Sequence, residues 1–196
     1  KEKALQLLRP FRDSIENSIY PLPVYRMAVG FGSGLGGILQ SLYLLKVLTG
    51  DQTLLEDSLN IVDKITENQL KKEKQPAVYT GLAGLIPGLL NLHKETGQNR
   101  CLDLAVLCGR QILKKKDSVK GNGWGNGNTG LAWALARLCQ KTGDDEFKTG
   151  LEEVVQALSI WEKELLSSEK GKNCRGSLCG GLAGLGMLKL ALMELD

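Results

Sequence analysis

The sequence predicts an all-α protein made of repeated helical hairpins, and two observations predict it. A glycine-rich phrase recurs every 46 to 54 residues, which leaves room for two helices and two connections. A Thr-Gly pair follows each of the first three phrases, with its glycine 16 residues after the first glycine of the phrase, where a helix would end. The phrases begin at Gly34, Gly81, Gly127 and Gly181, and the pairs contribute Gly50, Gly97 and Gly143.

Each phrase opens an apolar segment that we expect to form an inner helix. These segments span residues 38–48, 85–92, 131–138 and 185–195. Their side chains are apolar on nearly all sides, so the helices should be buried over most of their surface.

The segments after the Thr-Gly pairs predict outer, amphipathic helices. Phe147, Leu151 and Val154 fall on one helical face, with Glu152 and Glu153 opposite them. Residues 55–65 repeat this pattern, and residues 101–112 show a weaker version of it. Each unit therefore contains one buried helix and one helix with a face in water.

Such units, repeated head to tail, form either an open α-solenoid or a closed α/α barrel. Glycine at the start of each inner helix favours the barrel, because it removes Cβ atoms where converging helices crowd together. The inner helices would then present unpaired backbone N–H groups to one rim, where an anion could bind. The alternative is that the glycines are only caps and tight turns. Residues 1–196 are interpreted as one domain.

Composition excludes several classes of protein. Lys and Arg number 25 against 22 for Asp and Glu, and the short basic runs 71–74 and 114–116 are better explained as solvated helix ends than as a nucleic-acid surface. No apolar stretch of about 18 residues and no leader are present, which predicts a cytoplasmic protein without a membrane span. Five cysteines, an odd number, predict reduced thiols and not a disulfide scaffold.

Three glycine-rich stretches resemble the cyclase domain of lanthipeptide synthetases, the LanC-like family, and most closely the C-terminal cyclase of the class II (LanM-type) enzymes. The stretches are Gly32–Leu39, Gly123–Leu135 and Ser177–Gly184. The resemblance implies an α/α toroid of seven repeats, of which this chain would cover about repeats two to five. On this interpretation residues 1–196 are an incomplete cyclase domain, with hairpins that open at about residues 34, 81, 127 and 181.

The family adds peptide Cys thiols to dehydrated Ser or Thr in a precursor peptide, forming thioether rings in lantibiotic biosynthesis. This lyase-class reaction uses a bound zinc ion, which lowers the pKa of the thiol so that the nucleophilic thiolate is available near neutral pH. The resemblance therefore implies zinc as cofactor and a precursor peptide as partner.

Carried over residue by residue, the family's site is only partly present. Cys179 stands at the position of the first zinc-binding cysteine, and the other two ligands belong to a following repeat that we expect beyond this sequence. Asn126 stands at the position of the catalytic acid/base histidine, and Ala77 at that of the catalytic aspartate. Asn126 can donate a hydrogen bond but cannot exchange a proton near pH 7.

The remaining candidates have simpler interpretations. His93, the only histidine, is expected at the end of an inner helix and not as a metal ligand. Cys174 and Cys179 are five residues apart, wider than the spacing of zinc knuckles, so shared zinc binding is the less favoured alternative. The other cysteines are predicted core residues: Cys101, Cys108 and Cys139.

We therefore predict a cyclase of lanthipeptide biosynthesis that is incomplete or inactive as this chain alone. The alternative is a degenerate LanC-like module that binds a peptide or protein without catalysis. A glycosidase of the α/α-barrel type is disfavoured, because no Asp or Glu lies inside the glycine phrases. A plain α-solenoid scaffold is the remaining possibility. Open ends of the array should expose apolar surface, so we expect self-association or contact with the remainder of a longer synthetase.

Overall fold

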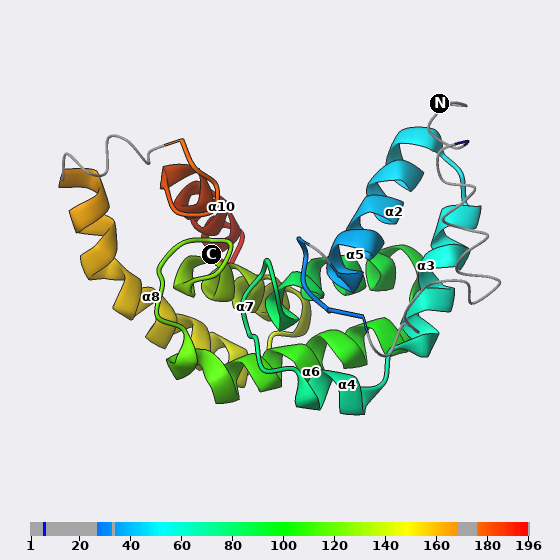
Figure 1. Cartoon of the computed structure of the whole chain (residues 1–196), viewed down its shortest axis with the longest axis horizontal. Coiled ribbons are helices and arrows are strands. Elements are labelled where there is room, and N and C mark those ends of the chain that lie inside the picture. Colours follow the sequence, from blue (N-terminus) through cyan, green and yellow to red (C-terminus); the bar gives the residue numbers. More distant parts are fainter. Residues whose placement is uncertain (1–5, 7–26, 33, 168–175, 196) are drawn as a thin grey trace.

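A computed structural model of the chain describes residues 6, 27–32, 34–167 and 176–195. Across these residues the regular structure is helical, with one isolated β-bridge between Gly121 and Gly127, which confirms the all-α prediction. The helices form an open arc with two rows (Figure 1). None of the described helices is both long and apolar enough to cross a membrane.

The inner row lies on the concave side of the arc and contains the helices that follow the glycine phrases. They are α2 (Leu35–Thr49), the short η2 (Leu82–Gly84) with α5 (Ile86–Thr96), α7 (Asn128–Thr142) and α10 (Leu182–Met193). Neighbouring inner helices pack together in chain order, α2 on α5, α5 on α7 and α7 on α10. Figure 1 shows α2 and α10 at the two ends of the arc.

The outer row covers the convex side. It contains α3 (Thr53–Lys64), α4 (Glu67–Lys72), α6 (Asn99–Lys115) with the short η3 (Lys116–Ser118), and α8 (Asp145–Ser167). The predicted amphipathic faces are confirmed on α8, where Phe147, Leu151 and Val154 are buried while Glu152 and Glu153 are exposed. The core therefore lies between the two rows.

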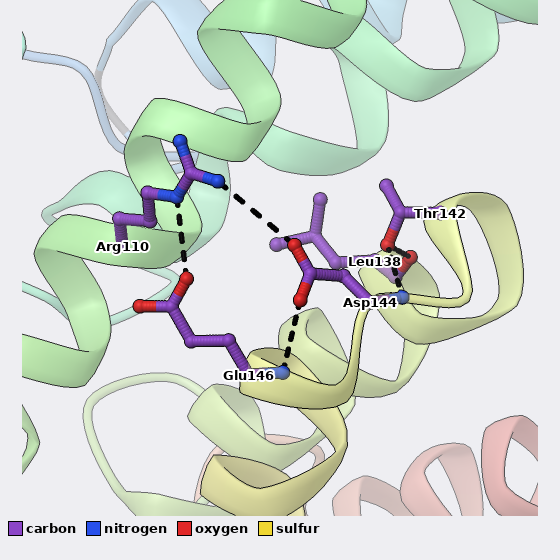
Figure 2. A network of polar contacts seen from close by, with 5 residues as sticks. All are labelled: Arg110, Leu138, Thr142, Asp144 and Glu146. Atoms are coloured by element: carbon purple, nitrogen blue, oxygen red, sulfur yellow. Dashed lines mark hydrogen bonds and ion pairs between the residues drawn. The ribbon is translucent and has the colours of Figure 1, made fainter.

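The Thr-Gly pairs end the inner helices as predicted. Gly50, Gly97 and Gly143 adopt left-handed conformations with φ of 74°, 69° and 65°, a region that favours glycine because it has no Cβ. In the third pair the Thr142 hydroxyl donates to the Leu138 carbonyl and accepts from the amide of Asp144 (Figure 2). This hydroxyl bridges the helix end and the next connection, so the turn is fixed in place.

The same turn also starts the outer helix α8. The Asp144 carboxylate accepts the amide N–H of Glu146 at 2.9 Å, which satisfies a donor in the first turn of α8 (Figure 2). Arg110 on α6 reaches both acidic side chains, at 3.9 Å from Asp144 and 3.3 Å from Glu146. Arg110 thus links the turn between α7 and α8 to the neighbouring outer helix α6.

Burial of the inner row differs between the middle and the ends of the arc. The predicted burial on most sides is confirmed for α5 and α7, whereas the prediction is wrong for α2 and α10. Among the described residues, each of these two helices has an inner neighbour on one side only, which accounts for its exposed apolar side chains. The exposed side chains are Leu44, Val47 and Leu48 on α2, and Met187, Leu190 and Met193 on α10.

Candidate functional site

The loops that lead into the inner helices form one continuous layer, which we call the rim: residues 27–32, 73–81, 119–127 and 176–181. Backbone hydrogen bonds join these loops in chain order. Phe31 donates to Val78 at 2.9 Å, Tyr79 to Gly125 at 2.7 Å, and Gly125 to Cys179 at 3.4 Å. The rim therefore brings together segments that are about 50 residues apart in the sequence.

The glycine phrases are needed because the rim packs against the helix starts. The last glycine of each phrase lies against the carbonyl oxygen of the residue six positions earlier, so a Cβ there would collide with backbone. The pairs are Gly37 with Phe31, Gly84 with Val78, Gly130 with Trp124, and Gly184 with Leu178. Glycine serves close backbone approach within each loop, in addition to the contacts between neighbouring helices that the sequence predicted.

The expectation of unpaired N–H groups at the rim is wrong for three of the helix starts. The first amides donate to loop carbonyls seven residues earlier: Leu35 to Ala28 at 2.9 Å, Leu82 to Gln75 at 3.0 Å, and Asn128 to Gly121 at 2.8 Å. Because the loop folds back over the helix end, its carbonyls occupy the donors that an anion would use.

Two of the sequence-predicted positions share one pocket at the rim, which we call the rim pocket. Ala77 is buried and Asn126 is exposed, and both line a cavity of about 500 Å³. The described residues that line it are Gln75, Pro76, Ala77, Thr80, Ser118, Val119, Lys120, Gly121 and Asn126. An acid/base site of two residues would require positions 77 and 126 to lie together, as they do in this pocket. Neither Ala77 nor Asn126 can transfer a proton near pH 7.

Cys179 lies beside this pocket and does not line it. It is an exposed, free thiol, and its sulfur lies next to Gly125, the residue before Asn126. Cys174, the other candidate in this loop, is outside the described residues. Cys179 is thus the one sequence-predicted ligand whose position at the rim the structure describes.

The other histidine and cysteine predictions concern structural roles. His93 lies in the last turn of α5, with its Nδ1 3.1 Å from the carbonyl oxygen of Gln98. Cys101, Cys108 and Cys139 are buried in the core. Burial raises the pKa of Cys101 to about 11 and also raises the pKa of Cys108 and of Cys139, so these thiols are protonated and unreactive near neutral pH.

Sequence reasoning missed an aromatic cluster that joins two loops of the rim to α7. The Trp124 ring lies 6.0 Å from Phe31, edge to face, and 5.3 Å from Trp133. These rings line a second cavity, of about 520 Å³, which also borders Leu44 of α2 and Leu190 of α10. The Trp124 indole N–H is buried without a hydrogen-bond partner among the described residues. The two tryptophans of the stretch Gly123–Leu135, on either side of the third phrase, were the available signal.

The comparison with protein families decides the relationship. A model described as lanthionine synthetase C-like protein matches residues 1–122, more than half of the chain. The chain belongs to this family. The all-helical arc is consistent with a part of the LanC-like toroid. A comparison with curated proteins found no match. Within the matched residues lie Ala77 and Lys120 of the rim pocket, whereas Asn126 and Cys179 follow them.

Zinc is the cofactor associated with LanC-like proteins, and the described residues of this chain do not fit it. No three His, Cys, Asp or Glu side chains among them are grouped so that they could hold a metal ion. Protein zinc sites use three or four such ligands. Cys179 therefore cannot hold zinc tightly with the described residues alone.

Proposed function

We propose that this chain acts in lanthipeptide biosynthesis, as the part of a LanC-like cyclase that holds a precursor peptide at the rim. The described residues alone would not form thioether rings. The observation that carries this proposal is the pairing of Ala77 and Asn126 in the rim pocket, next to an exposed Cys179 thiol. On this proposal the rim pocket corresponds to the catalytic site of the family, but Ala77 and Asn126 replace the residues that would transfer protons.

The proposed chemistry of the complete cyclase is addition of a peptide Cys thiol to dehydrated Ser or Thr. In this chain, Asn126 would contribute a neutral amide donor, which can orient a carbonyl group but cannot protonate an enolate. Cys179 would be one zinc ligand, and its companions would lie outside the described residues. The glycine-rich motifs most resemble those of the cyclase domain of class II synthetases. The free thiols of the described cysteines favour a cytoplasmic location.

The test measures thiol loss. The chain is incubated with a dehydrated precursor peptide and zinc, and free thiols are counted by alkylation and mass spectrometry. We expect no loss relative to a sample without enzyme. The double variant Ala77→Asp/Asn126→His restores the residues that the family resemblance implies, and Asn126→Gln is its matched control.

Three outcomes decide between the alternatives. Thiol loss with the unchanged chain would overturn the proposed inactivity. Thiol loss with the double variant and not with Asn126→Gln would support a cyclase site that lacks its proton-transfer groups. Failure of every form to bind the peptide would overturn the proposed role in holding a precursor peptide. Equal zinc content in the unchanged chain and in Cys179→Ala would remove Cys179 from any metal site.

A further inference from the structure

The rim pocket has an unusual set of polar groups. Lys120, Asn126, Thr80 and Gln75 line it, and no described residue makes a hydrogen bond or ion pair with any of these four side chains. No Asp or Glu is among the described residues that line it. The pocket therefore presents one ammonium and three neutral donors, with no built-in anion to neutralise the charge.

The surface around the pocket is also basic. Segments 67–75 and 114–120 lie side by side, since the Lys115 ammonium donates to the carbonyl oxygen of Glu73 at 2.7 Å. Together they contain seven lysines: Lys71, Lys72, Lys74, Lys114, Lys115, Lys116 and Lys120. They contain three acidic residues: Glu67, Glu73 and Asp117.

The acidic side chains of these segments already have partners within the protein. Glu67 pairs with Lys71 at 2.7 Å, Asp117 approaches Lys116 at 3.4 Å, and Glu73 accepts the backbone N–H of Gln75 at 2.8 Å. None of the three lines the rim pocket. Lys116 also pairs with Glu153 of α8 at 2.9 Å. The segments still retain an excess of positive charge beside a pocket that has an unpaired ammonium.

From this charge distribution we infer that the rim pocket binds a carboxylate of an acidic peptide segment. The carboxylate accepts from the Lys120 ammonium and from the Asn126 amide, while further acidic side chains of the peptide face the surrounding lysines. The inference rests on the proposed function only in taking a peptide as the molecule that carries the carboxylate.

A carboxylate fits this pocket better than a phosphate group does. A phosphate carries about −1.5 to −2 charges at neutral pH and is commonly held by backbone N–H groups at a helix start. At Leu82 and Asn128 those N–H groups already donate to loop carbonyls. One lysine with neutral amide and hydroxyl donors matches the single charge of a carboxylate.

The test is a binding measurement that does not depend on ring formation. A rhodamine-labelled peptide of alternating Glu and Ser is titrated with the whole chain, and its fluorescence anisotropy is compared with that of the Gln-Ser counterpart. We expect tighter binding of the Glu-Ser peptide, weakened by added NaCl. Lys120→Met should weaken it about three- to tenfold, the range for one partly exposed charge-assisted hydrogen bond.

Matched variants make the result specific. Lys120→Arg should retain binding, and Lys141→Met, which removes an exposed lysine at the end of α7, should leave it unchanged. Circular dichroism of each variant excludes loss of fold as the cause. Equal binding of the two peptides, or equal binding by Lys120→Met and the unchanged chain, would overturn the inference, as would tighter binding of oligothymidylate than of the Glu-Ser peptide. Failure of the cyclase test would leave these binding results unaffected.

Discussion

The amide of Gly125 donates a hydrogen bond to the carbonyl oxygen of Cys179 over 3.4 Å, and a Cβ at residue 125 would lie 3.2 Å from the Cys179 sulfur. This contact joins the third and fourth loops of the rim. It places the exposed thiol against the residue that precedes Asn126. The position of Cys179 relative to the rim pocket therefore depends on the absence of a side chain at residue 125.

Gly125→Ala is expected to displace the exposed Cys179 loop, because the new methyl group would lie 3.2 Å from the sulfur, and to be less favourable for stability than Gly121→Ala. The urea midpoint gives the stability change, and the rate of Cys179 modification by a thiol reagent gives the movement of the loop. Gly121→Ala is the matched control in the same loop, since the nearest atoms would be 3.8 Å and 4.0 Å from its Cβ. An equal effect of both substitutions would contradict the role assigned to Gly125.

Asp144→Ala should destabilise the chain by about 1 kcal/mol, because the first turn of α8 loses the carboxylate that accepts the Glu146 N–H. Thermal unfolding monitored at a helical wavelength measures the change. Asp144→Asn keeps an acceptor but removes the negative charge that faces Arg110. We expect the asparagine variant to stay close to the unchanged chain, since exposed ion pairs contribute little. A loss as large as that of the alanine variant would show that the ion pair dominates.

Alkaline conditions should destabilise the fold through Cys101. Burial raises the pKa of this thiol from 9.0 to about 11, so the folded state holds its proton more tightly than the unfolded state does. The resulting stability is present below pH 9 and is lost as the pH rises to about 11. Cys101→Ala should flatten this part of the stability curve in urea titrations. An unchanged slope in Cys101→Ala would contradict this assignment.

The helix starts and ends were predictable from sequence because they depend on local chemistry. Gly50 must adopt a positive φ at the end of α2, and a glycine followed by an apolar run is a local signal for Gly34 and Gly127. The pairing of the amides of Leu35 and Asn128 with loop carbonyls was not predictable. These bonds join backbone atoms, and no side-chain type marks them.

The composition of the rim pocket likewise required the three-dimensional structure. The resemblance pointed to Ala77 and Asn126 separately, but no motif marked Lys120, which follows the basic run 114–116 after three residues. Only the hydrogen bonds between loops bring residues 77, 120 and 126 around one cavity. The exposed apolar face of α10 depends on its place at the end of the arc, because its sequence is as apolar as that of a buried helix.

Self-association through the ends of the arc is the last prediction. Leu48 on α2 is 79% exposed and Met193 on α10 is 73% exposed, and exposed apolar faces of this kind commonly mark contact surfaces. The apparent mass in light scattering should therefore rise with protein concentration. Met193→Gln should reduce this rise, because it places an amide in the apolar face. Ile160→Gln changes a side chain of similar size and exposure, 69%, on the outer helix α8 and should have no effect. A constant monomer mass at high concentration would mean that these faces do not bind a second copy.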